Sequence, residues 1–387
     1  MKIVFFAHPL FLGSQSMPRF VNMLAEGMQS RGHEVEIWRP EPLFRNIPVN
    51  GLKKWLGYID QYLVFPQKSK RKIKNNKQDV LYVVTDHALG PYVPLVSNLP
   101  HVIHCHDFLA QASAKGIYPQ NITSATGIKY QAYIHSGYNM GKNFISVSEK
   151  TRDDLALYLD HPAKRSEVVY NGLNPAYKEL PVVSSRQALG NVFNLHLEQG
   201  YILHVGGNQW YKNRIGVIAI YDQWRKDYGK QLPLILIGQQ ASASLMKRQE
   251  ASPYKNDIHF FSGVEDEAVR LAYAGASVFL FPSIAEGFGW PIAEAMASGT
   301  VVVTTNEAPM LEVAGEAAFL IAAKPVKIEE EERWAEESAL VLEEALKLNE
   351  VARKEWLKKG FQQIEKFKLT DALDRIEKIY REVLNDK

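Results

Sequence analysis

The sequence has 387 residues, a formal net charge of +2, 46% hydrophobic residues and a single cysteine, Cys105. This length favours two domains, the small net charge argues against nucleic acid as a partner, and one cysteine excludes an internal disulfide. The apolar start is too short for a signal-peptide core, and no apolar stretch approaches the roughly 18 to 20 residues that span a bilayer, so we expect a soluble cytoplasmic protein.

The first half of the chain alternates short apolar runs with helical stretches. Residues 3–7 form a continuous apolar run, as expected for a strand buried on both faces of a parallel sheet. A loop marked by Pro9 and Gly13 follows, and then a helix that Ser16 can cap. Further strands are predicted at residues 34–38, 80–85, 101–104, 144–147 and 168–170.

The pattern then restarts in the second half. Pro175, Pro181 and residues 182–185 are predicted to form a linker. Beyond it a helix is predicted over 214–228, and strands at 201–205, 234–237, 258–261, 278–281 and 301–304. Strands that alternate with helices in both halves predict an α/β protein with two doubly wound, Rossmann-like domains, over about 1–175 and 185–365.

The loop after the strand at 278–281 carries the most informative pattern. Glu286 lies in this loop, and Gly287 and Gly289 let the backbone approach a ligand closely. Pro291 begins the next helix, whose N–H groups and dipole favour an anion such as a diphosphate. Glu294 lies about one helical turn further on and can reach a hydroxyl-rich ligand. The pattern favours a site for a sugar and a diphosphate over a glycine-rich turn with a capping glutamate.

This segment resembles the signature of the retaining glycosyltransferases of family 4, which have the GT-B fold. In the family pattern, GFG follows a first glutamate, and seven residues separate this glutamate from a second one. Glu286 and Glu294 match this pattern. Residues 104–107, 147–152, 171–174, 266–276 and 304–315 resemble further family landmarks, so the resemblance covers nearly the whole chain. It implies two Rossmann-like domains facing across a cleft that holds the active site. The acceptor side is the first domain, joined by the C-terminal helix 370–387, and the donor side is the second.

The resemblance also implies roles for the residues of the signature. Glu294 would hold the ribose of the nucleotide, and Glu286 would contact the donor sugar at its reacting face. The backbone of Gly287, Phe288 and Gly289 would lie against the donor, with N–H groups binding sugar hydroxyls or diphosphate oxygens. No metal or cofactor is implied; the nucleotide-sugar, UDP- or GDP-linked, is a substrate.

The resemblance implies that three residues outside the signature also belong to the site, and the sequence offers His87 as a weaker candidate. His106 would line the catalytic cleft from the first domain, and His87 is a second candidate there. Gly13 would lie under the diphosphate, and Val264 matches the position that meets the nucleotide base. Taken alone, Gly13 would be a turn glycine and His106 a loop histidine with satisfied hydrogen bonds.

Lys212 lies in the loop after the first strand of the second domain, where a lysine neutralises a leaving diphosphate. The family usually has an arginine five residues earlier, and here Gly207 occupies that position, next to Asn208. Either Lys212 acts alone, or the Asn208 amide or Arg214 compensates. As a residue near a helix start, Arg214 would ordinarily be a solvated surface charge.

The motifs that are absent narrow the reaction class. The sequence has no Asp-x-Asp motif, P-loop or GxGxxG after the first strand, so we expect no metal and exclude ATPases and dehydrogenases. The predicted function is transfer of a sugar, with retention, to a hydroxyl of a glycan or lipid-linked acceptor in polysaccharide biosynthesis. Two alternatives stay open: a nucleotide-sugar epimerase or phosphorylase of the same fold, and a non-catalytic sugar-binding relative.

Residues 53–77 form a basic segment with eight lysines and arginines and one acid, Asp60, interleaved with aromatic residues. Such a segment can lie on an anionic membrane surface. It can equally be a solvated helix face that packs its aromatic side chains into the first domain. The first interpretation would place the protein at the inner face of the membrane.

Overall fold

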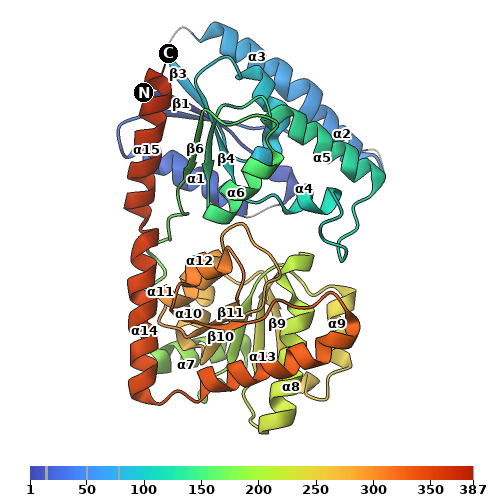
Figure 1. Cartoon of the computed structure of the whole chain (residues 1–387), viewed down its shortest axis with the longest axis vertical. Coiled ribbons are helices and arrows are strands. Elements are labelled where there is room, and N and C mark those ends of the chain that lie inside the picture. The colour runs from blue at the N-terminus through green and yellow to red at the C-terminus, as the bar shows by residue number, and fades with distance from the viewer. Residues whose placement is uncertain (14–15, 49–50, 77–78, 387) are drawn as a thin grey trace. The chain divides into compact units, whose positions relative to one another are not determined.

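The computed structural model describes residues 1–13, 16–48, 51–76 and 79–386, which fold into two α/β units (Figure 1). The first unit comprises Met1–Ile117, Ile122–Tyr170 and Thr370–Lys387, and the second Tyr118–Asn121 and Asn171–Leu369. Lys77 of the basic segment and Lys387 of the predicted C-terminal helix lie outside the described residues. Each unit is built on a parallel six-stranded sheet.

The sheet of the first unit has the strand order β2-β1-β3-β4-β5-β6. Its strands are β1 (Lys2–Phe6), β2 (Glu34–Trp38), β3 (Val80–Val84), β4 (His101–Cys105), β5 (Asn143–Ser146) and β6 (Arg165–Val168). All five residues of β3 are buried, as its continuous apolar sequence predicts. The chain winds one way from β1 to β2 and the other way from β3 onward. The switch point, where the winding direction changes, therefore lies between β1 and β3.

Helices cover both faces of this sheet (Figure 1). They are α1 (Ser16–Gln29), α2 (Lys53–Ile59), a π-helical turn (Asp60–Val64), α3 (Phe65–Asn75), a 3-10 segment (His87–Leu95), α4 (Leu109–Ala114), α5 (Ala125–Tyr138), α6 (Glu149–Tyr158) and α15 (Leu369–Asn385). The C-terminal helix α15 is tied to the sheet by a buried hydrogen bond of 2.7 Å between Tyr380 Oη and His104 Nε2.

The core of the first unit is rich in aromatic side chains. Phe6 of β1 packs edge-on against Trp38 of β2, with ring centroids 5.6 Å apart, and against Phe65 of α3, at 6.0 Å. Aromatic pairs prefer such edge-to-face packing. The core thus fixes the strands whose carboxyl ends carry the polar residues described below.

The sheet of the second unit has the order β12-β11-β10-β7-β8-β9. Its strands are β7 (Ile202–Val205), β8 (Leu234–Gly238), β9 (Ile258–Ser262), β10 (Val278–Phe281), β11 (Val302–Thr305) and β12 (Ala318–Ile321). The winding direction changes between β7 and β10, which is the switch point of this sheet. The sequence did not predict β12, because a run of four apolar residues cannot be assigned by its period alone.

The helices of the second unit are α7 (Val182–Phe193), α8 (Arg214–Tyr228), α9 (Ala243–Glu250), α10 (Asp266–Gly275), α11 (Trp290–Ala297), α12 (Met310–Ala314), α13 (Glu331–Leu346) and α14 (Glu350–Ile364). Residues 182–185, predicted as part of a linker, form the first turn of α7, so that prediction was wrong. Proline and serine at a helix start resemble a linker in sequence, whereas the side chain of Leu189 one turn later is fully buried.

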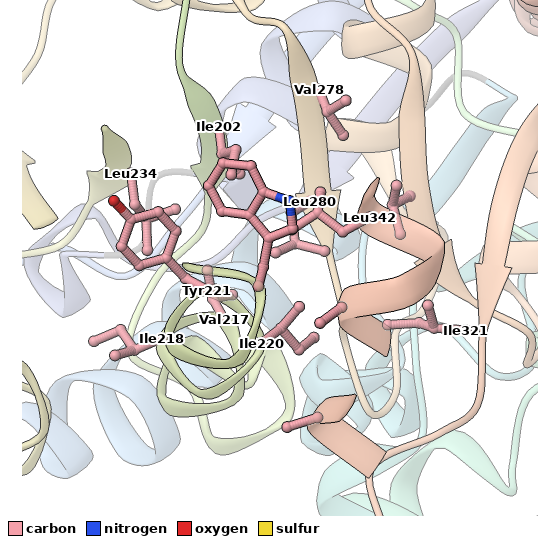
Figure 2. Close-up of a cluster of buried hydrophobic side chains, with 14 of the residues drawn as sticks. Ile202, Val217, Ile218, Ile220, Tyr221, Leu234, Val278, Leu280, Ile321 and Leu342 are labelled. Atoms are coloured by element: carbon pink, nitrogen blue, oxygen red, sulfur yellow. The ribbon is translucent and has the colours of Figure 1, made fainter. Parts of the chain in front are cut away.

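Between the sheet and helices α8 and α13, the second unit has an aliphatic core (Figure 2). Val217, Ile220 and Tyr221 of α8 meet Leu234 and Leu280 of the sheet, and all five are fully buried. Burial of aliphatic and aromatic side chains of this size contributes about 1.5 to 3 kcal/mol each. This packing anchors α8, whose first residues reach the candidate site.

Candidate active site

A lysine and a glutamate pair at the switch point of the second sheet. Lys212 follows β7 and Glu286 follows β10, and the Lys212 Nζ lies 2.8 and 2.9 Å from the two carboxylate oxygens of Glu286. Their side chains are 15% and 8% exposed. Open α/β sheets bind ligands outside the carboxyl ends of the strands at this topological position. The sequence placed both residues in loops, and the structure shows that they meet.

Hydrogen bonds hold the two loops together, and one more orients Glu286 within its own loop. The backbone N–H of Ile284 donates to Tyr211 O at 2.7 Å, and the Asn213 side-chain amide donates to Pro282 O at 2.9 Å. Ser283 Oγ donates to Glu286 Oε1 at 2.6 Å. The pair is therefore held in place by its own loops before any ligand binds. Ser283 was missed in the sequence, although its place two residues after a buried strand is a usable signal.

Glu294 lies inside α11, 8% exposed, and its Oε2 accepts a 2.9 Å hydrogen bond from Tyr273 Oη. Burial and the charge of Glu294 hold the pKa of Tyr273 well above its usual value, so this tyrosine stays a donor. Gly289 precedes α11 with φ of 109°, a conformation that favours glycine. Phe288 is buried with its ring edge-on to Phe367, the centroids 5.4 Å apart. The signature thus forms a well-packed loop and helix start, with Gly287 next to Glu286.

The structure corrects the expectation for Arg214. This residue is 4% exposed rather than a solvated surface charge, and its Nη1 donates to Asn208 Oδ1 at 2.6 Å and to Gln239 O at 3.0 Å. Its Nε and Nη2 are buried, and among the described residues neither has a hydrogen-bond partner. Burial lowers the pKa of Arg214 to about 10. Among the residues that the structure describes, no carboxylate forms an ion pair with this guanidinium.

Asn208 connects the loop after β7 to the loop after β8. Its backbone N–H donates to Gln239 Oε1 at 2.9 Å and its side-chain amide donates to Gln240 O at 2.6 Å. Gly207 precedes it, and a Cβ built there would lie 2.4 Å from Gln209 Oε1, so a larger residue would require Gln209 to move. Asn208 and Arg214 form one network that links the Lys212 loop to the loop after β8.

The remaining candidate of the second unit lies further along the sheet. Val264 is half-buried between β9 and α10. A groove of about 580 Å³ opens at this edge, lined in part by Gln239, Gln240 and Phe261. Its lining includes none of the predicted donor-binding residues, but Gln239 and Gln240 in it bind Asn208.

The other candidates belong to the first unit. His106 follows β4, is 9% exposed and has its Nε2 2.9 Å from Thr85 O; burial lowers its pKa. His87 is buried with its ring 4.3 Å from that of Phe108. Gly13 ends a short 3-10 turn with φ of 73°, which glycine adopts readily. The structure brings neither His87 nor Gly13 into hydrogen-bond contact with His106 among the described residues.

The basic segment is helical through α2, the π-helical turn and α3. Its described lysines and arginines, seven between 53 and 74, are all exposed. Its aromatic residues divide: Phe65 is buried in the first unit, whereas Trp55 is 60% exposed. Of the helices that the structure describes, none has the length and apolar content needed to cross a bilayer.

Comparison with known proteins identifies the family. The sequence model of the glycosyl transferases group 1 matches residues 185–355, and that of Glycosyltransferase Family 4 matches residues 17–177. O-antigen chain mannosyltransferase B of Escherichia coli is 30% identical over 196 residues, which are 48% of this chain and 49% of that protein. The match thus spans about half the length of this relative.

Solved structures share the fold. Sucrose-phosphate synthase from Thermosynechococcus elongatus superimposes with a TM-score of 0.76 at 16% identity, covering 100% of both chains. HepE from Anabaena, solved in complex with UDP-glucose, gives a TM-score of 0.72 at 15% identity, also covering 100% of both chains. The predicted fold class is confirmed: the two doubly wound units have the GT-B fold, and the chain belongs to the glycosyl transferases group 1.

Proposed function

We propose that this protein transfers a hexose from a nucleoside-diphosphate sugar to a hydroxyl of a glycan or lipid-linked acceptor, with retention and without a metal. The observation that carries the proposal is the Lys212–Glu286 pair at the switch point of the second sheet, 2.8 Å apart at its closest. The relative named an O-antigen chain mannosyltransferase and the neighbour in complex with UDP-glucose support this substrate class.

The chemistry of the pair suits departure of a diphosphate. Negative charge grows on the diphosphate as the glycosidic bond breaks, and a preplaced cation stabilises that charge without reorganisation. We propose that Lys212 Nζ turns from Glu286 to the diphosphate when the donor binds. Glu286 then accepts hydrogen bonds from hydroxyls of the donor sugar. The N-terminus of α11, at Phe288 and Gly289, lies on the same loop and favours an anion.

Glu294 is proposed to hold the ribose, because its carboxylate is buried and oriented by Tyr273. Val264 is proposed to meet the base. Gly13 stays a candidate for a position under the diphosphate, and His106 stays a candidate for the catalytic cleft. The metal-free mechanism rests on the positive charge that Lys212 supplies.

A lipid-linked acceptor would require proximity to a membrane. We propose that the basic segment contacts an anionic bilayer surface, since its described basic residues and Trp55 are exposed. Co-sedimentation with phosphatidylglycerol vesicles tests this. Binding should fall when Lys68, Lys70 and Lys72 are changed to glutamine, and unchanged binding would favour a solvated helix face.

The proposed reaction is tested by incubating the full chain with UDP-glucose or GDP-mannose and methyl glycosides as acceptors. NMR of the product then reports the configuration of the new bond. A new glycoside with the donor's anomeric configuration supports the proposal. An isomerised donor formed without any acceptor would indicate an epimerase instead, and inversion would contradict the retaining mechanism.

A further inference from the structure

A second polar pair lies at the switch point of the first sheet. His8 follows β1 and Asp86 follows β3, and His8 Nε2 lies 2.9 Å from Asp86 Oδ2. These are the strands between which the winding direction of that sheet changes. The pair therefore has the topological position that Lys212 and Glu286 have in the second unit, where open sheets bind ligands.

Asp86 is fixed by its surroundings. Its Oδ1 accepts a 3.0 Å hydrogen bond from the backbone N–H of Ala88, and His87 Nδ1 lies 3.0 Å from the same oxygen, outside hydrogen-bond geometry. Burial raises the pKa of Asp86, but the imidazoles of His8 and His87 outweigh that effect and hold the pKa well below its usual value. An ionised carboxylate only accepts hydrogen bonds, so His8 carries its proton on Nε2.

In the neutral imidazole, this arrangement leaves the other ring nitrogen of His8 as an acceptor. The His8 side chain is 18% exposed, and among the described residues no second hydrogen bond reaches its ring. The unprotonated nitrogen of a neutral imidazole accepts a hydrogen bond from an alcohol, and the nearby Asp86 carboxylate would repel the charge of a phosphate. The His8–Asp86 pair therefore favours a neutral ligand, whereas the Lys212 ammonium favours an anion.

A comparison within the same unit separates a binding pair from a structural one. His33 forms a similar bond to a carboxylate, Nε2 to Glu377 Oε1 at 2.8 Å, at the amino end of β2. Its side chain is 3% exposed, and its Nδ1 lies 3.3 Å from the Met1 amino group. Both nitrogens of His33 are therefore used within the fold, whereas His8 keeps one at the ligand-binding edge of the sheet.

We infer that His8 and Asp86 form a binding site for a sugar hydroxyl in the first unit, in which His8 Nδ1 accepts the hydrogen bond and Asp86 is the positioning residue. The inference rests on the proposed function and specifies it: the ligand is the acceptor sugar, a neutral polyol, rather than the nucleotide. No charge on the acceptor is needed for its recognition here.

The test compares His8→Phe and Asp86→Asn with the control His33→Phe. In the transfer assay the first two variants should raise the acceptor KM about tenfold, the scale of one hydrogen bond to a charge-coupled group. Their dissociation constants for UDP and GDP should stay those of the unchanged protein. The control should keep both values, and melting temperatures identify any variant that fails to fold.

A second measurement needs no turnover. The ring Cε1–H resonance of His8, assigned by its loss in His8→Phe, should shift on titration with methyl α-mannoside or methyl α-glucoside but not with UDP or GDP. A resonance that responds to the nucleotides, or to none of these probes, overturns the inference. If the unchanged protein binds neither nucleotide and transfers no sugar, the proposed function fails instead. Normal transfer with an unchanged KM in His8→Phe rejects only the His8 site.

Discussion

Lys212 and Glu286 lie 74 positions apart in the sequence, yet both carboxylate oxygens of Glu286 lie within 2.9 Å of the Lys212 ammonium. The two residues follow the adjacent strands β7 and β10, between which the second sheet reverses its winding. The fold therefore places one positive charge and one carboxylate where a donor with a diphosphate and a hydroxylated sugar would need both.

Replacing Lys212 should reduce turnover more than donor binding, because the charge that it stabilises develops in the transition state. We expect Lys212→Ala to lower kcat about a hundredfold or more, the scale found when one stabilising donor is removed. Lys212→Arg should restore kcat only in part, because the planar guanidinium of arginine differs from the compact ammonium of lysine on its flexible side chain. The exposed Lys226 of α8 supplies the control Lys226→Ala. A kcat near normal in Lys212→Ala would remove Lys212 from the mechanism.

Arg214 should contribute to function at the expense of stability. A buried guanidinium without a carboxylate partner carries an uncompensated desolvation cost, which Arg214→Met removes. We expect this variant to keep or raise the melting temperature. It should bind UDP or GDP more weakly than the unchanged protein, whereas its affinity for UMP or GMP should change less. Arg225→Met is the matched control on α8, because Arg225 is also buried but is paired with Asp257 at 2.6 Å. The control should lose stability. If both variants are destabilised alike, Arg214 is a structural residue.

Glu294→Ala should weaken donor binding more than it slows the chemical step, because its proposed partner is the non-reacting ribose. One charge-assisted hydrogen bond contributes about 1.5 to 3 kcal/mol, which is roughly ten- to a hundredfold in affinity. Calorimetric titration with UDP and GDP measures the effect. Tyr273→Phe keeps the carboxylate and should cost less. An unchanged dissociation constant in Glu294→Ala would exclude the ribose contact.

The strands were largely predictable from sequence, and the pairings between loops were not. Continuous apolar runs such as β3 and β10 identify buried parallel strands, because both faces of such strands are covered. Glu286 and Glu294 could be found because both lie in one strand–loop–helix segment. The partner of His8 lies 78 positions away, and sequence spacing carries no signal for such a contact.

The burial of Arg214 was missed for a related reason. It is the first residue of α8, and charged residues at that position are usually exposed. Here the helix start turns the side chain toward Asn208 and Gln239, which are held by the neighbouring loop after β8. Only the packing of α8 on the sheet determines this, and that packing depends on residues distant in sequence.

Sugar transfer should persist in EDTA, since the proposed stabilisation of the diphosphate comes from Lys212 and the start of α11 rather than from a divalent cation. The measurement compares initial rates with excess EDTA, Mg²⁺ and Mn²⁺. Activity that is lost on chelation and restored by either metal would contradict the charge scheme.

Two buried histidines should make the fold sensitive to acid. Burial lowers the pKa of His104, in the first unit, and of His204, in the second, from 6.5 to about 3. Below pH 6.5 the unfolded chain therefore binds protons that the folded chain does not, so stability is complete above that pH and falls as pH drops toward 3. Each histidine should contribute a loss of about 1.4 kcal/mol per pH unit in this window.

Urea unfolding at several pH values between 7 and 4 measures this loss. His104→Gln retains a group that can bond to Tyr380, and His204→Asn retains a donor for Leu280 O, which lies 3.0 Å from His204 Nδ1. Each variant should flatten the acid side of the stability profile of its own unit, because a non-titrating side chain binds no proton on unfolding. The exposed His196 provides the control His196→Gln, which should leave the slope unchanged. A slope that is equally steep in His104→Gln and in the unchanged protein would show that His104 is already protonated in the fold.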